Sequence, residues 1–281
     1  MDKPAFDPAR FKEQERAGFN LVAQRYEAAM HMLQPAVVRL LALAELEPGM
    51  AVLDVATGPG MVARQAARLV SPGGKVLGVD IAEAALEQAR RQAAAETLTQ
   101  VVSFEVADAE NLPFEAASFD RVLCSMGLMH FPNTAQALAE FKRVLKPGGK
   151  LVAAVWGEEA EAAFVAVAAQ NLSRNFPPPK VERPSMFRFG KAEVLEKLVA
   201  DAGFSQAKAE AVRLEATYPD AASYWGKFLD VAGITTVSLM KQSTEVREHL
   251  EKDVAKDLAP YQTSSGYHLT STIMLISAFN S

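Results

Sequence analysis

The sequence has one cysteine, Cys124, and no long apolar run. A single cysteine excludes an intramolecular disulfide, a multi-thiol metal site and any mechanism that needs several cysteines. No stretch reaches the roughly 18 apolar residues of a membrane-spanning helix, and the charged residues 1–16 lack the apolar core of a signal peptide. We therefore expect a cytoplasmic protein with no membrane span and no metal site.

Positive charge is also scarce, because 29 Lys and Arg face 34 Asp and Glu, for a formal net charge of −5. Binding to nucleic acid needs a basic face that neutralises phosphates, so nucleic acid is excluded as the main partner. A composition that is 49% hydrophobic and 22% charged is typical of a soluble globular protein. The 281 residues suffice for one well-buried core that carries a substantial insertion.

The most informative stretch is VLDVATGPG at residues 52–60. Val52–Val55 predicts a short strand, and residues 61–70 predict a helix because their apolar side chains recur at helical spacing. Gly58 and Gly60 lie in the turn between the two elements. A strand that turns into a helix through glycines brings backbone N–H groups close to a ligand.

Two classes of cofactor use such a turn. The segment GPGMVA at 58–63 satisfies the dinucleotide fingerprint, and Asp80 lies at the distance where that motif has an acid for the ribose. Asp54, however, would repel a pyrophosphate and attract an ammonium, and Pro59 removes one N–H donor. The turn therefore favours S-adenosylmethionine (SAM), a cationic nucleoside without phosphate. An NAD(P)-dependent oxidoreductase stays as the alternative, although the expected helix has no Tyr-x-x-x-Lys pair.

Five segments carry a resemblance to a known family: VLDVATGPG (52–60), LGVDIA (77–82), VADAENLPF (106–114), FDRVLCSMGLMHFPN (119–133) and RVLKPGGKLV (143–152). In this order the chain resembles class I SAM-dependent methyltransferases of type 11, which are related to quinone-biosynthesis C-methyltransferases, over roughly residues 20–156. The resemblance implies an α/β fold with a Rossmann-like, seven-stranded, mostly parallel sheet, an antiparallel last strand and helices on both faces. It also implies methyl transfer from SAM to a small-molecule acceptor.

The resemblance assigns cofactor contacts to acids that follow predicted strands. Asp80 would accept both ribose hydroxyls, and the alternative is that it caps the helix predicted at 83–95. Asp108 would hold the adenine amino group beside the N–H of Ala109, and the alternative is a surface turn. The predicted cofactor-binding residues are Tyr26, Asp54, Ala56, Thr57, Gly58, Gly60, Asp80, Ile81, Asp108, Ala109, Ser125 and Met126.

His130 and Tyr26 are the candidate catalytic residues. His130 follows the fourth predicted strand, where a general base would meet the acceptor; the alternatives are that it caps the next helix or binds a backbone group. In the resembling family a tyrosine covers the methionine end of SAM, and Tyr26 could do so and touch the acceptor, or simply pack a helix–sheet interface. His31 and His268 are the other possible bases.

The chain divides into three predicted parts, and the third of them contains two predicted lids. They are an N-terminal helical cover (1–45, with 1–17 as an arm or a short amphipathic helix), a SAM-binding core (46–157), and the rest of the sheet with lid insertions (158–281, lids at about 158–190 and 217–265). The alternative for the lids is a homodimer interface or an extension of the core. The resemblance thins after Gly157, which leaves a quinone and other small metabolites open as acceptors, and SAM binding without methyl transfer also stays open.

Overall fold

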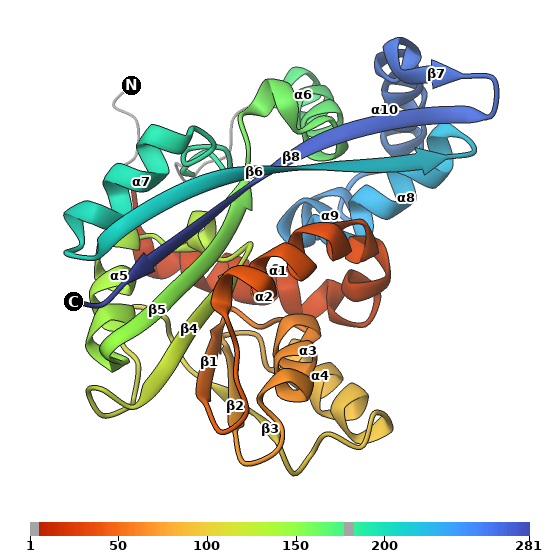
Figure 1. Cartoon of the computed structure of the whole chain (residues 1–281). Helices are drawn as coiled ribbons and strands as arrows, with labels where there is room; N and C mark the ends of the chain where they lie inside the picture. The colour runs from red at the N-terminus through yellow and green to blue at the C-terminus, as the bar shows by residue number, and fades with distance from the viewer. Residues whose placement is uncertain (1–5, 177–182) are drawn as a thin grey trace.

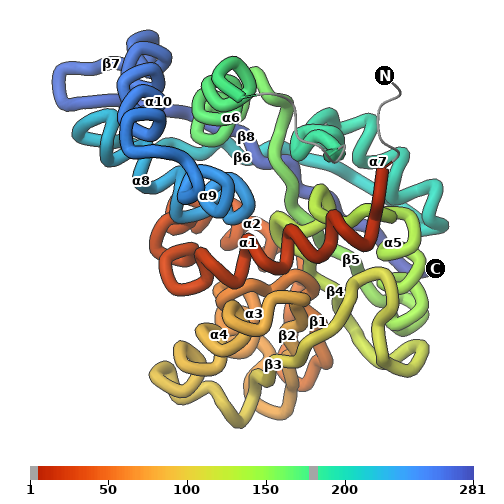
Figure 2. The backbone as a smooth tube through the Cα atoms, turned by 180° about the vertical axis from the view of Figure 1, so that it is seen from behind, coloured from red at the N-terminus to blue at the C-terminus, as the bar shows by residue number. Residues whose placement is uncertain are grey.

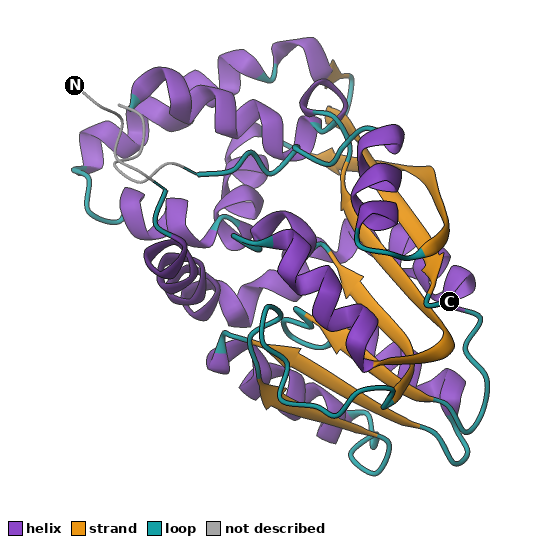
Figure 3. Ribbon diagram, turned by 90° about the vertical axis from the view of Figure 1, so that its left-hand side faces the viewer, coloured by secondary structure: helices purple, strands orange, loops and turns teal. Residues whose placement is uncertain are grey.

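The computed structural model describes residues 6–176 and 183–281, which build one mixed sheet with helices on both of its faces (Figures 1 and 3). The strand order is β3-β2-β1-β4-β5-β8-β6, with β7 beside β8. Neighbours from β3 to β5 are parallel, and β8 is antiparallel to both β5 and β6. The strands are β1 (Ala51–Val55), β2 (Lys75–Asp80), β3 (Val102–Val106), β4 (Phe119–Ser125), β5 (Leu145–Trp156), β6 (Ser205–Tyr218), β7 (Gln262–Thr263) and β8 (Gly266–Phe279).

This topology confirms the predicted fold class, including an antiparallel last strand between the fifth and the sixth. The sequence did not predict β7 or the extension of β6 as far as Tyr218. The extra residues of β6 pair with β8 beyond the point where β8 leaves β5, at the pair Trp156 and Ile273. The two strands thus continue as a ribbon past the rest of the sheet (Figure 1).

The helices predicted at 61–70 and 83–95 have the predicted bounds. The helices of the described residues are α1 (Pro8–Ala29), α2 (Gln34–Ala44), α3 (Met61–Val70), α4 (Glu83–Ala95), α5 (Thr134–Val144), α6 (Ala163–Asn175), α7 (Ala192–Asp201), α8 (Ala221–Val231), α9 (Gly233–Leu239) and α10 (Thr244–Asp257). Short 3-10 turns span Met30–Leu33, Leu128–His130, Glu159–Glu161 and Ala259–Tyr261. Among the described residues, no helix combines the length and the apolar character needed to cross a membrane.

The prediction for residues 1–17 is wrong in its extent. Helix α1 starts at Pro8, where the Asp7 side chain accepts a hydrogen bond from the N–H of Arg10, and it runs without a break to Ala29. Its buried face includes Glu15, a charged residue that interrupts the apolar pattern. The helical periodicity of apolar residues therefore does not predict this part of the helix. Residues 1–5 of the expected arm and residues 177–182 of the first expected lid lie outside the described residues.

Helix α1 crosses the molecule between the sheet and the helices of the second insertion (Figure 2). It packs on α4 on one side and on α8 and α9 on the other. The crossing with α9 is backbone against backbone, because a Cβ on Gly18 would lie 2.6 Å from the nitrogen of Ile234, and one on Gly233 would lie 2.4 Å from the carbonyl carbon of Gly18. Glycine at both positions therefore sets the distance between α1 and the insertion.

We expect Gly18→Ala to lower the free energy of unfolding by about 1–3 kcal/mol, because the new methyl group forces α1 and α9 apart. Gly226→Ala in α8 is the matched control, since a Cβ there meets nothing within 4 Å. This control should gain up to about 1 kcal/mol from its better helix propensity. Urea unfolding followed by circular dichroism measures both variants, and equal stabilities would contradict the close crossing.

Candidate functional site

The glycine turn after β1 has a backbone that is tied to β2. Ala56, Gly58 and Gly60 have positive φ angles of 56°, 53° and 82°. The N–H of Thr57 donates to the carbonyl of Val79 at 3.0 Å. Gly60 also requires the absence of a side chain, because its Cβ would lie 2.9 Å from the ring of Phe104 and from Ala89. The turn is therefore a rigid platform at the carboxyl ends of the strands, where ligands of open α/β sheets bind.

A cavity of about 120 Å³, here called the inner cavity, lies over this turn. Its walls come from α1, the turn and the ends of β1 to β4. The structure brings together at this cavity His130 and every predicted cofactor-binding residue except Gly60, which packs behind the turn. His31 lines a different groove, and His268 lies in β8 with its Nε2 3.8 Å from Glu215, so neither lines the inner cavity.

Asp54 brings a buried carboxylate to the inner cavity and is 1% exposed. Its Oδ2 accepts a hydrogen bond from the hydroxyl of Thr57 at 2.6 Å, whereas its Oδ1 is buried without a hydrogen-bond partner among the described residues. Burial raises the pKa of Asp54 to about 7 and the charge of Asp80 adds to that effect, whereas the hydroxyl of Thr57 and the nearby N–H of Ala63 oppose it. A buried acceptor without a donor is unfavourable, so this oxygen is a place for a donor from a ligand.

Asp80 ends β2 and faces the turn. Its Oδ2 accepts from the N–H of Gly58 at 2.9 Å, and its Oδ1 accepts from the N–H of Ala82 at 2.9 Å. Burial raises the pKa of Asp80, and these N–H groups oppose the rise. Asp80 is not the N-cap of α4, because Ala82 occupies that position. The N–H of Ala84 in the first turn donates to the side chain of Asn20 and not to Asp80. Each carboxylate oxygen keeps a second lone pair for a ligand hydroxyl.

Asp108 has an ion-pair partner that the sequence did not indicate. The ammonium of Lys12 lies 2.6 Å from Asp108 Oδ2 and 2.6 Å from Glu110 Oε2. Asp108 also accepts the N–H of Asn111 through its backbone carbonyl, so it is part of a turn as well as of the cavity wall. The pair with Lys12 fastens the N-terminal half of α1 to the loop after β3.

His130 pairs with a buried carboxylate from α1. Its Nδ1 lies 2.7 Å from Oε2 of Glu15, and Arg183 Nη1 lies 2.9 Å from Oε1 of Glu15. Burial alone would raise the pKa of Glu15, but the hydrogen bond with His130 and the charges of His130 and Arg183 outweigh it, so the pKa is lowered. The cap alternative for His130 is wrong, because Asn133 caps α5.

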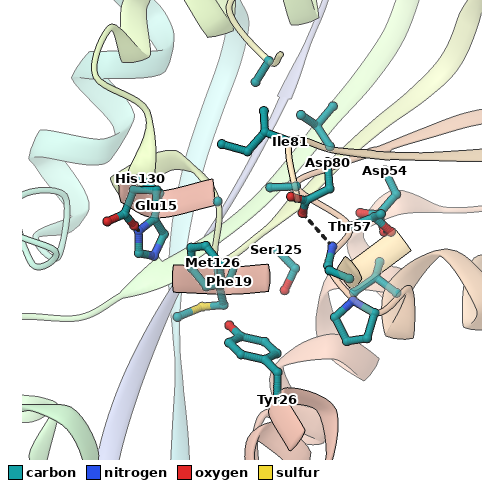
Figure 4. Close-up of a pocket in the computed structure, with 18 of the residues that line it drawn as sticks. Glu15, Phe19, Tyr26, Asp54, Thr57, Asp80, Ile81, Ser125, Met126 and His130 are labelled. Carbon is teal, nitrogen blue, oxygen red and sulfur yellow. Dashed lines mark hydrogen bonds and ion pairs between the residues drawn. The ribbon is translucent and has the colours of Figure 1, made fainter. Parts of the chain in front are cut away.

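The two sides of the inner cavity carry different groups (Figure 4). Glu15 and His130 lie on one side, Asp54 and Asp80 on the other, and the ring of Tyr26 lies between them. Burial raises the pKa of Tyr26, with the charge of Asp80 second, so the phenol keeps its proton. Tyr26 is therefore suited to cover or to donate a hydrogen bond, and poorly suited to remove a proton.

A second cavity of about 450 Å³, here called the outer cavity, shares a wall with the inner one. The residues that line both are Glu15, Phe19, Tyr26, Met30, Met126 and His130. Its remaining walls come from Trp156, α6, residues 183–187 and residues 228–235. The two insertions that we predicted as lids thus contribute to this cavity, and the buried Trp156 lies in its wall.

Residues 46–201, more than half of the chain, match the family model described as a methyltransferase domain. The chain belongs to this family. The match confirms the family that the five motifs indicated and disfavours the oxidoreductase alternative.

Known proteins similar to this methyltransferase-family chain agree with the match. The chain is 40% identical over 139 residues to a ubiquinone/menaquinone biosynthesis C-methyltransferase of Bordetella parapertussis. The aligned region covers 48% of this chain and 53% of that protein. It thus spans about half of that relative's length.

Two solved structures share the fold. One, from Bacillus halodurans, has a TM-score of 0.61 at 24% identity and covers 88% of this chain and 99% of its own. The other is a Haemonchus contortus phosphoethanolamine N-methyltransferase in complex with SAM, with a TM-score of 0.59 at 20% identity, covering 99% of this chain and 61% of its own.

Proposed function

We propose that this chain is a SAM-dependent methyltransferase that acts on a small-molecule acceptor. In this proposal SAM occupies the inner cavity, the acceptor occupies the outer cavity, and the methyl group crosses the wall that they share. Residues 1–45 then act as the cover, residues 46–157 as the SAM-binding core, and the insertions at 158–190 and 217–265 as the lid over the acceptor.

The observation that carries the proposal is the unpartnered Oδ1 of Asp54 in the inner cavity. The ammonium group of SAM is a donor of the right charge for this oxygen, and Asp80 offers lone pairs to the ribose hydroxyls. Asp108 adds a third carboxylate to the same lining. A lining with this excess of carboxylates favours a cationic nucleoside and disfavours a pyrophosphate.

The chain's own residues then have two tasks. When bound, SAM supplies a methyl group that is already activated by its sulfonium. Phe19, Tyr26 and Met126 separate the cavities with mostly apolar surface, which aligns the reactants and excludes water. His130 directs Nδ1 at Glu15, so Nε2 is the atom that takes the proton of an O–H or N–H acceptor.

Two measurements test the proposal. Isothermal titration calorimetry should show binding of SAM and S-adenosylhomocysteine and no binding of NAD. Mass spectrometry of acceptors incubated with enzyme and SAM should show a gain of about 14 Da, which separates methyl transfer from SAM binding without it. Binding of NAD in place of SAM would overturn the proposal.

We expect Asp80→Ala to weaken SAM binding by about 1–3 kcal/mol, because the ribose hydroxyls lose a charged acceptor. Asp220→Ala is the matched control, since Asp220 also accepts a backbone N–H, that of Ser223, but lies at the start of α8 and lines neither cavity. Calorimetry with SAM measures both variants. Equal affinity in Asp80→Ala and the wild type would remove Asp80 from the binding site.

A further inference from the structure

Arg64 is a buried charge that none of the motifs explains. It lies in the first turn of α3, directly after the glycine turn, and is 4% exposed. A buried guanidinium is unfavourable unless several acceptors surround it. The partners of Arg64 therefore indicate why the chain places a charge there.

The three partners of Arg64 come from three elements that surround the inner cavity. Its Nη1 donates to the carbonyl of Pro59 in the glycine turn at 2.6 Å, and its Nη2 donates to Glu27 in α1 at 2.5 Å. Its Nε donates to Glu96, at the end of α4, at 3.0 Å. The planar fork of a guanidinium fixes the directions of these bonds, which a lysine ammonium does not.

The contact with Glu27 matters because of its neighbour in the sequence. Tyr26, which lines both cavities, directly precedes Glu27 in α1. Pro59 lines the inner cavity between the two glycines of the turn. Arg64 thus connects the part of α1 that carries Tyr26 with the turn that forms the floor of the cavity, through one hydrogen bond to Glu27 and one to Pro59.

We propose that Arg64 is a positioning residue that holds the Tyr26 end of α1 at a fixed distance from the glycine turn. SAM then binds between two surfaces whose separation is set before it arrives. This inference rests on the proposed function. The competing explanation is that Arg64 only stabilises the packing of α1, α3 and α4 and has no influence on the ligand.

The test compares the affinity for S-adenosylhomocysteine in folded variants. Arg64→Met should raise its dissociation constant by about 5- to 150-fold, the usual range for coupled sites, at a temperature well below the unfolding midpoint. Arg64→Lys should recover only part of this loss, because an ammonium carries its three donors on one atom and lacks the planar fork that points at three separate acceptors. Arg68→Met is the matched control: Arg68 binds the same Glu96 from the outer side, with 51% of its side chain exposed, and contacts neither Glu27 nor Pro59.

Hydrogen exchange adds a readout that packing alone would not change. In the wild type, S-adenosylhomocysteine should slow amide exchange both in the glycine turn and in residues 22–29 of α1. In Arg64→Met the protection of the turn should remain, while that of α1 should be lost. If Arg64→Met does not fold, Glu27→Gln removes the charge of one partner and keeps its acceptor oxygen, so it should show the same two changes at smaller size.

The outcomes separate the two proposals. Failure of the wild type to bind S-adenosylhomocysteine would overturn the proposed function. Normal binding by the wild type, together with equal affinity and equal α1 protection in a folded Arg64→Met, would overturn the role of Arg64 alone. Loss of affinity in Arg68→Met as large as in Arg64→Met would also overturn it, since the effect would then come from Glu96.

Discussion

We expect the replacement of His130 by alanine to lower kcat by about 100- to 10 000-fold, while the dissociation constant of SAM stays nearly unchanged. That range is the usual contribution of a positioned general base. His130 lies in the wall that both cavities share. In the proposed function its loss therefore removes the proton acceptor and leaves the carboxylates of the proposed SAM site in place. Steady-state kinetics with an identified acceptor and calorimetry with SAM provide the two numbers.

The pH dependence of the rate decides whether His130 acts as a base. In the wild type the rate at saturating SAM should rise with pH on the acid side, because the imidazole must be neutral to accept a proton. The Ala variant should lose this rise. His31→Ala is the matched control, since His31 lines a separate groove. The same rate–pH profile in the wild type and in His130→Ala would exclude the base.

Glu15→Gln completes this experiment with a residue that sequence reasoning missed. The amide keeps the size of Glu15 but removes the negative charge 2.7 Å from Nδ1 of His130. The protonated imidazole then loses its electrostatic partner, so we expect a smaller fall in kcat than in His130→Ala, again with SAM affinity retained. A double variant no slower than His130→Ala alone would show that Glu15 acts through His130.

The local part of the site follows from the sequence. Asp54, the glycine turn and Asp80 lie within one strand–turn–helix–strand unit, where spacing along the chain fixes position in space. The same holds for α3 and α4, whose predicted and observed bounds coincide. Ser125 and Met126 also lie where predicted, because a parallel strand ends at the same edge of the sheet as its neighbours.

The contributions of α1 could not be derived in this way. Lys12 and Glu15 lie in a charged segment that is typical of an exposed arm, and their partners Asp108 and His130 are about a hundred residues away in the sequence. No periodicity indicates such a pair, because the partners meet only once α1 lies across the cavity. The signal in the sequence is the position of Glu15, which falls on a helix face whose other buried residues are apolar. A Glu at such a position indicates a buried partner.

The second large effect concerns Asp54, whose replacement by asparagine should stabilise the protein at alkaline pH and weaken SAM binding. The folded protein holds the Asp54 proton up to about pH 7, whereas an ordinary carboxyl, with a pKa of 3.8, has lost it. Between these values the folded state binds more protons, so the contribution of Asp54 to stability decreases as the pH rises. By about pH 8 the decrease amounts to about 4 kcal/mol.

Asparagine has no charge to bury, so Asp54→Asn should unfold at a higher temperature than the wild type at about pH 8 and at a similar temperature at about pH 4. Asp120→Asn is the matched control with the opposite sign. Hydrogen bonds with Lys146 and with the N–H of Ala51 outweigh burial and lower the pKa of Asp120, so its charge stabilises the fold above its ordinary pKa. Asp120→Asn should therefore be less stable than the wild type at neutral pH.

Asp54→Asn should lower the affinity for SAM, although it raises the stability at about pH 8. A carboxylate that meets an ammonium contributes more than a neutral amide, so Asp54→Asn should raise the dissociation constant by about 10- to 100-fold. Wild-type affinity should also increase as the pH rises from about 5.5 to 7, because binding requires the charged form of Asp54. The variant should lack this dependence. If Asp54→Asn is no more stable than the wild type at about pH 8, the burial of the Asp54 charge is not unfavourable. If it also binds SAM like the wild type, the Oδ1 of Asp54 does not contact the cation of SAM.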